Sequence, residues 1–327
     1  MTNWPEPKDK FSKGLWSCTT IEEVGQLHGL WFKAFNGKAI NSVAKRKISK
    51  ETRTTLKALL QQVGATSSPT LIGERSCNTA WEMLHVHLCN IVTRDPSVEV
   101  ALVTFISGDG ATSHYKTEID LFTSQQTVQK TLRAMSPNWF GVTELALFNS
   151  QGFPGGGQLV QRHEHALIFG KGVIARAKVV AARHESRYSS NSTGAPVIDI
   201  KAVTTDEVNL ARISAYLFKP PYKCMNWNPG KDGKRGHMNG SEKSDRLIRY
   251  LRLAQYRCMM DFEQTTFGGG EGLRIRSSII AFLRALAVKD ADAGRRVLHP
   301  DAVATFWVDL TKELGAPWNL PIIKTRP

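Results

Sequence analysis

Long apolar segments are missing from this 327-residue chain. No run approaches the roughly 18 apolar residues that a membrane-spanning helix needs. Residues 1–7 also lack the basic and then apolar pattern of a secretory signal. We therefore expect a soluble, cytoplasmic protein with no membrane partner.

Cysteine is scarce, and its positions follow no pattern. The five cysteines are Cys18, Cys77, Cys89, Cys224 and Cys258. An odd number without any Cys-x-x-Cys spacing argues against both a disulfide framework and a zinc knuckle. We expect all of them to be reduced, ordinary residues.

A phosphate-binding loop of the nucleotide-hydrolysing type is also missing. The triplet Gly268-Gly269-Gly270 is not followed by the Gly-Lys-Ser or Gly-Lys-Thr that such a loop requires. We interpret the triplet as a hinge and expect no nucleotide-driven motor in this chain.

Positive charge, in contrast, is abundant. The chain has 43 Lys and Arg against 29 Asp and Glu, a formal net charge of +14, and residues 171–250 carry +8 of it. Such a field favours polyanions, and nucleic acid is the partner that we predict. The basic residues that we expect to contact it are Lys171, Arg176, Arg212 and Lys223.

Helical spacing dominates residues 1–95. Apolar residues recur at intervals of three and four after Thr20, which forms a predicted capping box with Glu23. A second amphipathic segment spans residues 52–63. We predict a helical N-terminal region over 1–95.

Residues 96–225 have a different pattern, in which β-rich runs alternate with helical segments. The expected strands cover 98–106, 139–148, 159–170 and 197–202, a hairpin loop covers 149–158, and the expected helices cover 124–135, capped by Ser124, and 204–219, capped by Thr204 and Glu207. Residues 226–245 are rich in Gly, Asn and Lys and are expected to form a linker or mobile loop. Further helices are predicted near 245–262, 275–288 and 301–314.

These patterns together predict an α+β fold. We expect a central antiparallel sheet flanked by helices in residues 96–225, followed by a helical C-terminal region over 226–327. The terminal regions could bind duplex DNA or mediate oligomerisation, although neither contains a motif for it.

The chain contains two His-x-His pairs, so the bare pattern carries little weight. His85 and His87 lie around Trp81 in a segment of helical apolar spacing. On a helix, side chains two residues apart diverge by about 200°. We interpret this pair as structural.

The second pair lies in the strand expected over 159–170. Side chains alternate between the faces of a strand, so His163 and His165 point the same way, roughly 7 Å apart, while Glu164 points to the other face. The preceding strand pairs with this one across the hairpin and contains one carboxylate, Glu144. These three side chains are a predicted ligand set for Mg²⁺ or Mn²⁺ that leaves positions open for phosphate oxygens and water. A rim or salt-bridging role for Glu144 is the alternative.

The helix expected over 204–219 carries a tyrosine and a lysine on one face. Tyr216 and Lys219 are three residues apart, and Arg212 lies one turn before them. A tyrosine on a helix is most often a packing residue, which is the alternative here. Tyr222 follows two prolines, and we interpret it as structural.

In this order, the features resemble the HUH endonucleases, specifically the single-tyrosine initiators of rolling-circle replication found in plasmids and small DNA viruses. The resemblance rests on Leu102-Val103-Thr104-Phe105 for the first family motif, His163-Glu164-His165 for the metal motif and Tyr216-Leu217-Phe218-Lys219 for the nucleophile motif, within residues 96–225. Glu164 departs from the family, which has a bulky apolar residue there. Because it faces away from the predicted metal, it needs only a polar environment or solvent.

The resemblance implies an RRM-like core and metal-dependent nicking and joining of single-stranded DNA. Tyr216 would be the nucleophile that forms a 5′-phosphotyrosine, and Glu144 the third metal ligand. Lys219 would lower the pKa of the tyrosine or hold a phosphate oxygen. The partners it implies are single-stranded DNA or a DNA stem-loop at an origin, a host helicase and a second copy of the chain. A transposase or mobilisation relaxase with the same chemistry, and a non-catalytic nucleic-acid-binding protein with the same fold, remain open.

Overall fold

The structure is a computed structural model. It describes residues 14–44, 46–61, 70–71, 73–113, 118–150, 157–190, 196–228, 237–241, 248–293, 299–316 and 319–325. The helices are η1 (Leu15–Ser17), α1 (Ile21–Asn41), α2 (Lys50–Gln61), α3 (Glu74–Arg94), η2 (Gly108–Gly110), α4 (Leu121–Met135), α5 (Val173–His184), η3 (Glu185–Arg187), α6 (Glu207–Leu217), α7 (Ile248–Met259), α8 (Phe262–Thr265), α9 (Glu271–Asp292) and α10 (Pro300–Leu314). The strands are β1 (Glu99–Phe105), β2 (Ala111–Ser113), β3 (Glu118–Asp120), β4 (Trp139–Ser150), β5 (Gly157–Gly170), β6 (Ile198–Val203), β7 (Cys224–Asn228), β8 (His237–Ser241), β9 (Thr266–Gly269) and β10 (Ile322–Lys324).

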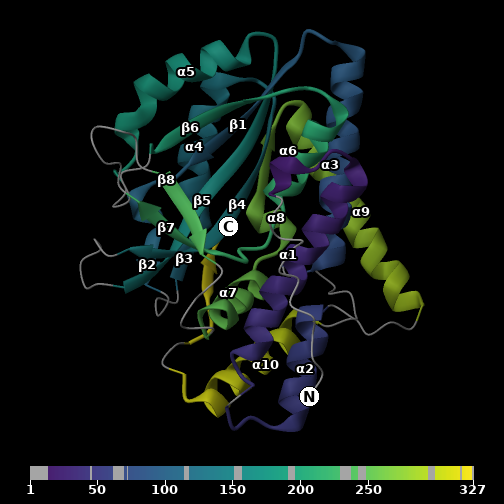
Figure 1. Ribbon diagram of the computed structural model, residues 1–327, viewed down its shortest axis with the longest axis vertical. Coiled ribbons are helices and arrows are strands. Elements are labelled where there is room, and N and C mark those ends of the chain that lie inside the picture. Colours follow the sequence, from purple (N-terminus) through teal and green to yellow (C-terminus); the bar gives the residue numbers. More distant parts are fainter. Residues whose placement is uncertain are drawn as a thin grey trace.

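A largely antiparallel sheet forms the centre of the molecule (Figure 1). Its strand order is β6-β1-β5-β4-β7-β8, with β2 also paired to β5 and β9 also paired to β4. The pairing of β7 with β4 is parallel, whereas β4 and β5 form a long antiparallel hairpin. A separate parallel pair joins β3 to β10. The predicted α+β class is therefore confirmed.

Helices cover both faces of the sheet (Figure 1). On one face, α4 and α5 pack on Val103 and Ile168 of the central strands. On the other face, α1, α3 and α6 contribute to a cluster around Leu102, Phe140 and Leu167. Because side chains alternate along each strand, one strand supplies residues to both clusters.

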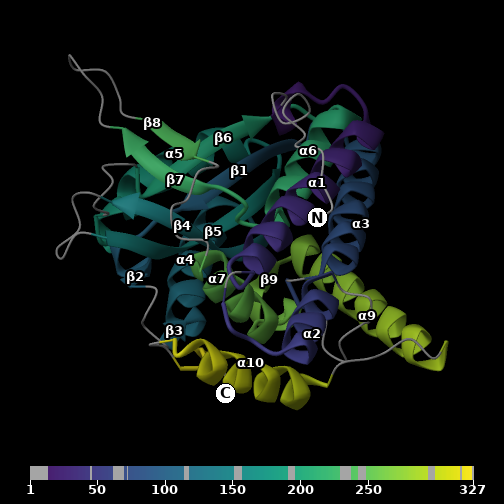
Figure 2. The ribbon, with the colours of Figure 1, turned by 60° about the horizontal axis from the view of Figure 1, so that its bottom comes forward.

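A third cluster lies below the sheet, where α2, α7 and α10 meet the end of the β4–β5 hairpin (Figure 2). The basic helix predicted near 245–262 is present as α7, but it is almost wholly buried. Arg249, Arg252 and Arg257 are each at most 3% exposed. The guanidinium of Arg252 is bound by the carbonyl oxygen of Asn319 and lies over the ring of Tyr256. These arginines therefore serve packing rather than a charged surface.

Most of the predicted elements are confirmed. The α-helices α1, α2 and α3 precede β1, and the four expected strands appear as β1, β4, β5 and β6. Thr20 caps α1 by accepting the backbone N–H of Glu23, although the Glu23 carboxylate bonds to Thr19. The tip of the predicted hairpin loop, residues 151–156, lies outside the described residues. Of the described helices, none is long and apolar enough to cross a membrane.

Two predicted helix caps are wrong. Asp120 caps α4, and Ser124 is a buried residue inside that helix. Asp206, not Thr204, accepts the capping bond at α6, from the backbone N–H of Asn209. In both cases an aspartate within four residues of the predicted cap is the cap instead. Ser, Thr and Asp have similar preferences for this position, so the sequence pattern did not distinguish them.

The region after residue 225 is not helical throughout, which corrects two predictions. Part of the expected linker over 226–245 forms β7 and β8, a strand pair at the edge of the sheet, and its remaining residues lie outside the described ones. The glycine triplet is not a hinge, because Gly268 and Gly269 belong to β9 and pair with β4. Gly270 has φ +54°, a left-handed conformation that favours glycine, and it begins α9.

Candidate functional site

The register of the β4–β5 hairpin brings Glu144 and both histidines together. Glu144 lies directly opposite His163, and His165 lies opposite Val142 two residues along. All three ligand candidates therefore point to the same face, the one that α1, α3 and α6 cover. Glu144, His163 and His165 are buried, with exposures of 4%, 7% and 2%.

The donor atoms of these three residues converge. Oε2 of Glu144 lies 3.2 Å from Nε2 of His163 and 3.1 Å from Nε2 of His165. One ligand atom from each residue lies within 4.8 Å of the others, so the cluster could bind a metal ion. Ligands about 2.1 Å from an octahedral ion, at right angles to one another, would be separated by about 3.0 Å, which these distances match. Two imidazoles and a carboxylate are also donors that first-row divalent cations accept.

The orientation of His165 is fixed by a neighbour on β1. Oγ1 of Thr104 lies 2.9 Å from Nδ1 of His165, which leaves Nε2 directed at Glu144. Hydrogen bonds of this kind set the tautomer and ring orientation of a histidine ligand. Nδ1 of His163 is buried and has no hydrogen-bond partner among the residues described. Thr104 belongs to the Leu102-Val103-Thr104-Phe105 motif of the sequence analysis. It lies opposite His165 in the β1–β5 register, which brings its hydroxyl to the imidazole.

Charge in the cluster is balanced by Lys219. Its Nζ lies 2.5 Å from Oε2 of Glu144. Burial by itself would raise the pKa of the Glu144 carboxyl, but Lys219 and the two imidazoles hold that pKa well below its usual range. Burial would likewise lower the pKa of Lys219, but Glu144, with a contribution from Tyr216, raises it. Burial lowers the pKa of His165 to about 3, so its imidazole is neutral and able to bind a cation.

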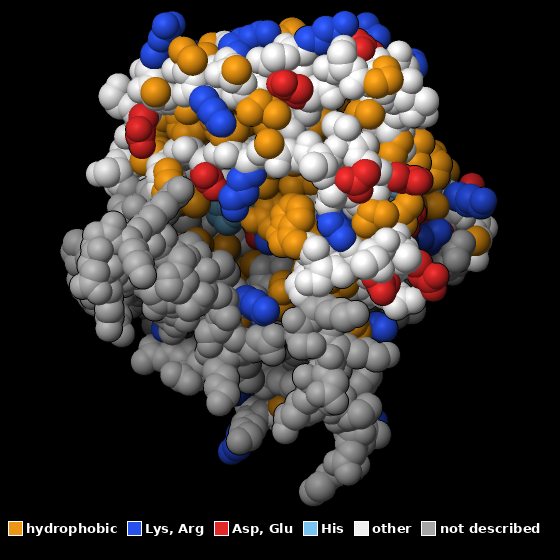
Figure 3. Space-filling model, turned by 45° about the horizontal axis from the view of Figure 1, so that its top comes forward, with side chains coloured by type: hydrophobic (Ala, Val, Ile, Leu, Met, Phe, Trp, Pro, Cys, Tyr) orange, Lys and Arg blue, Asp and Glu red, His pale blue; other side chains and the backbone are white. Residues whose placement is uncertain are grey.

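The end of α6 brings Tyr216 and Lys219 to this cluster, although the helix ends at Leu217 and not at Lys219 as predicted. The Tyr216 ring lies 5.1 Å from the ring of His165 in an edge-on arrangement, and Nζ of Lys219 lies 3.8 Å above the Tyr216 ring. Lys219 follows the cap residue of the helix, and its side chain reaches back over the last turn. The space-filling view shows basic and hydrophobic side chains around a hollow in the surface (Figure 3). The five residues predicted from the sequence are thus brought together.

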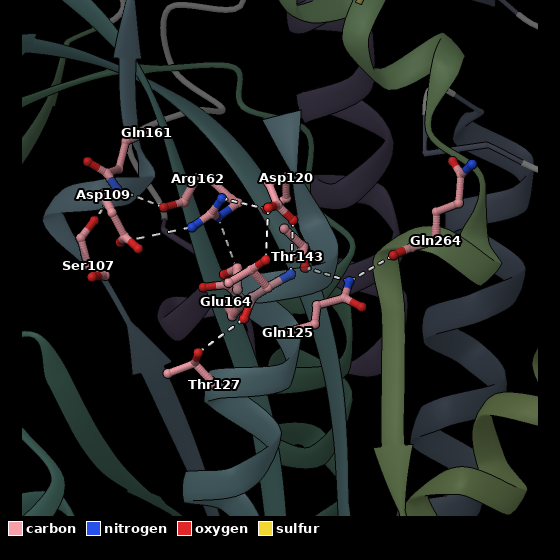
Figure 4. Close-up of polar contacts among 12 residues, drawn as sticks. Ser107, Asp109, Asp120, Gln125, Thr127, Thr143, Gln161, Arg162, Glu164 and Gln264 are labelled. Atoms are coloured by element: carbon pink, nitrogen blue, oxygen red, sulfur yellow. Dashed lines mark hydrogen bonds and ion pairs between the residues drawn. The ribbon is translucent and has the colours of Figure 1, made fainter. Parts of the chain in front are cut away.

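Glu164 lies on the reverse face of β5, as its position between the two histidines predicts. It is 2% exposed, and its carboxylate accepts a hydrogen bond from the hydroxyl of Ser124 on α4. Nε of Arg162 lies 3.3 Å from the same carboxylate oxygen, and Nη1 of Arg162 donates to the carbonyl oxygen of Asp120. Figure 4 shows Arg162 between these acceptors. The polar environment that a buried Glu164 requires is therefore present.

The other residues predicted to bind nucleic acid lie apart from the cluster. Lys171 is paired with Asp95, and Arg176 donates to the carbonyl oxygen of Lys171 at the start of α5, on the opposite face of the sheet. Arg212 binds the carbonyl oxygen of Cys18, and Nζ of Lys223 lies 5.1 Å from the centre of the Tyr222 ring. Their contacts with nucleic acid remain predictions.

The residues interpreted as structural are placed accordingly. His85 is buried on α3 and lies on a helix with His87, whose side chain diverges from it. Tyr222 stacks on Trp31 with ring centres 5.2 Å apart and the planes inclined by 15°. Neither His85 nor Tyr222 takes part in the cluster.

Comparisons with known proteins supply no relative. No protein-family model matches the chain, and no curated protein or solved structure gives a significant match. Function must therefore be argued from the geometry of the cluster and the tyrosine.

Proposed function

We propose that this protein is a metal-dependent endonuclease and strand transferase that cuts and rejoins single-stranded DNA through Tyr216. One observation carries the proposal: Tyr216 in the last turn of α6 and Lys219 just after the helix converge on a buried Glu-His-His cluster from two paired strands. Tyrosine and metal ligands come from separate parts of the chain, so their meeting is not a consequence of sequence proximity. Nucleophile, charge partner and metal donors within one site are the arrangement that phosphoryl transfer to a side chain requires.

The proposed reaction exchanges one phosphodiester bond for another. The hydroxyl oxygen of Tyr216 bonds to phosphorus, and the bond from phosphorus to the 3′ oxygen breaks. The phenol gives up its proton to solvent, and the leaving 3′ oxygen takes one up from solvent to become a 3′-hydroxyl, so no net proton is consumed. The product is a 5′-phosphotyrosine, and attack by a 3′-hydroxyl reverses the reaction and rejoins the strand. The ammonium of Lys219, 3.8 Å from the ring centre, stabilises negative charge that develops on the phenol oxygen and on the phosphate.

A divalent cation, Mg²⁺ or Mn²⁺, would be held by Glu144, His163 and His165. When bound, it supplies a Lewis acid for the scissile phosphate. Oε2 of Glu144 contacts both imidazoles and Lys219, so the carboxylate orients these three side chains. Thr104 fixes His165 and thereby the direction of its donor nitrogen.

The net charge of +14 and the resemblance to rolling-circle initiators support DNA as the substrate, either a single strand or a stem-loop at a replication origin. Replication initiation is the role that we propose, with a host helicase and a second copy of the chain as further partners. A transposase or a mobilisation relaxase would use the same residues in the same way.

The test is detection of the covalent intermediate. Purified protein is incubated with Mn²⁺ and a pool of single strands and hairpins labelled at the 3′ end, because the downstream fragment is the one that stays on the tyrosine. A labelled band that migrates with the protein in denaturing gels is expected for the wild type and is expected to disappear with Tyr216→Phe. Glu144→Gln and His165→Ala should abolish both this band and the Mn²⁺ binding measured by calorimetry.

Tyr222→Phe is the matched control. Tyr222 lies six residues from Tyr216, and its ring stacks on Trp31, so losing its hydroxyl should leave the adduct unchanged. A wild-type protein that binds the oligonucleotides but forms no adduct with any of them would favour the non-catalytic nucleic-acid-binding alternative.

A further inference from the structure

An exposed tryptophan lies beside the candidate nucleophile. Trp16 of η1 is 54% exposed, whereas the other tryptophans with described side chains, Trp31, Trp81, Trp139 and Trp307, are at most 4% exposed. Burying a tryptophan ring is strongly favourable, so a solvent-exposed one needs an explanation. Its ring centre lies 6.3 Å from that of Tyr216, a residue of the candidate site.

The exposure of Trp16 does not come from a loose segment. Leu15 and Cys18, on either side of it, are 4% and 5% exposed and belong to the core cluster under α6. The short helical turn is closed by hydrogen bonds from Ser17 to Gly14 and from Cys18 to Leu15. Arg212 of α6 binds the carbonyl oxygen of Cys18 and ties this turn to the helix of Tyr216. The ring is therefore held outward on a fixed backbone, which reduces the entropy lost when a ligand packs on it.

Trp16 continues a row of rings that begins at the candidate metal ligands. The ring centres of His163 and His165 lie 4.7 Å apart, those of His165 and Tyr216 5.1 Å apart, and those of Tyr216 and Trp16 6.3 Å apart. The row runs from buried histidines to a solvent-exposed indole. A strand whose phosphate lies at Tyr216 would therefore have a neighbouring base within reach of Trp16.

We infer that Trp16 is a stacking platform for an unpaired nucleobase next to the phosphate that Tyr216 attacks. This inference rests on the proposed function. It adds a binding contact that explains why the substrate is single-stranded. In a duplex both faces of a base are covered by its neighbours, so only an unpaired base can stack on the indole. Every base has a π face, so this contact is tolerant of sequence, and the basic character of the chain supplies the attraction for the phosphates.

Binding is measured by fluorescence anisotropy in EDTA, so that no cutting takes place. The probes are an oligothymidylate single strand, an abasic strand of equal length, and a duplex of equal length. Stacking of one base on an aromatic side chain corresponds to roughly 5- to 150-fold in affinity. We expect Trp16→Ala to weaken oligothymidylate binding within this range and to leave abasic-strand and duplex binding unchanged. Trp16→Phe keeps a smaller aromatic ring, so its affinity for oligothymidylate should fall less than that of Trp16→Ala.

Phe282→Ala is the matched control, because Phe282 is an aromatic residue on α9 with 51% exposure and should not affect any probe. Thermal denaturation of each variant shows whether the fold is retained. The inference is overturned if the wild type does not prefer oligothymidylate to the abasic strand, or if Trp16→Ala weakens all three probes equally. Because the assay needs no cleavage, a positive result together with an absent tyrosine adduct would remove the catalytic proposal and keep the stacking contact.

Discussion

Glu164 separates the two candidate histidine ligands in the sequence, and its side chain is held on the opposite side of β5. Alternation along a strand predicted this direction without any structure. The sequence did not identify Ser124 as its partner, because Ser124 was assigned to the cap of the helix and lies instead in the first turn inside it. A buried, hydrogen-bonded carboxylate between the histidines fixes the backbone from which both imidazoles extend.

Buried histidines also make stability depend on pH. Burial lowers the pKa of His28 from 6.5 to about 4, against the opposing effect of its hydrogen bond with Asn78. The folded state keeps this imidazole neutral, whereas the unfolded chain takes up a proton below pH 6.5. Its contribution is thus fully present above pH 6.5 and is lost as the pH falls towards 4. His165, with a pKa of about 3, acts in the same direction.

We expect the free energy of unfolding, measured by urea denaturation in EDTA, to fall as the pH is lowered through this window. Each of the two histidines contributes up to about 1.4 kcal/mol per pH unit. His28→Gln should reduce this slope, whatever it does to stability at neutral pH. An unchanged slope in the variant would show that His28 is not the group responsible.

At the scale of elements, apolar periodicity predicted the strands and most helices. It did not predict which residues cap the helices or which glycines are closely packed. The caps of α4 and α6 moved to aspartates that the periodicity could not distinguish from nearby Ser and Thr. The triplet Gly268-Gly269-Gly270 was predicted to be a hinge, yet these glycines, with Gly272, allow β9 and α9 to pack directly on β4. That packing depends on contacts between segments more than a hundred residues apart, which local sequence does not encode.

Gly272 tests this packing. A Cβ at this position would lie 1.7 Å from the carbonyl oxygen of Trp139, a backbone atom that cannot rotate away. Gly272→Ala should therefore lower the free energy of unfolding by about 1–3 kcal/mol or more. Gly37→Ala, in α1, meets no atom within 4 Å and should raise it by about 0.5–1 kcal/mol, since alanine favours a helix. Urea denaturation of both variants distinguishes a packed joint from a hinge, for which Gly272→Ala would be nearly neutral.

At the scale of the whole molecule, the candidate site could be predicted because its residues obey local rules. Alternation placed the two histidines together, and the hairpin placed Glu144 opposite His163. The predicted helix ends at Leu217, before Lys219, but the side chain of Lys219 still lies over the ring of Tyr216. The edge of the sheet could not be predicted in the same way. β7 pairs with β4 and β8 pairs with β7, and these pairings arise from the neighbouring strands rather than from the Gly- and Asn-rich sequence of β7 and β8.

Different helices cover the two faces of the sheet, and they expose different side chains to solvent. The face with Tyr216 is covered by helices of the N-terminal region and α6, whereas α5 covers the other face. On α5, Arg176, Lys178 and Arg183 are exposed. Lys and Arg side chains also gather along the upper margin of the space-filling view, the end of the molecule where α5 lies in Figure 1 (Figure 3). A basic surface away from the tyrosine is suited to hold the phosphates of flanking duplex DNA.

If α5 binds phosphates, part of the salt dependence of duplex DNA affinity should come from its basic side chains. Each phosphate contact adds about 0.9 to the slope of log affinity against log salt concentration. Lys178→Glu combined with Arg183→Glu should therefore reduce the slope for duplex DNA by roughly two, in titrations at several salt concentrations. Arg274→Glu combined with Lys289→Glu changes the net charge equally, but on α9. If the two double variants reduce the slope by the same amount, the effect comes from overall charge, and α5 is not a DNA-binding surface.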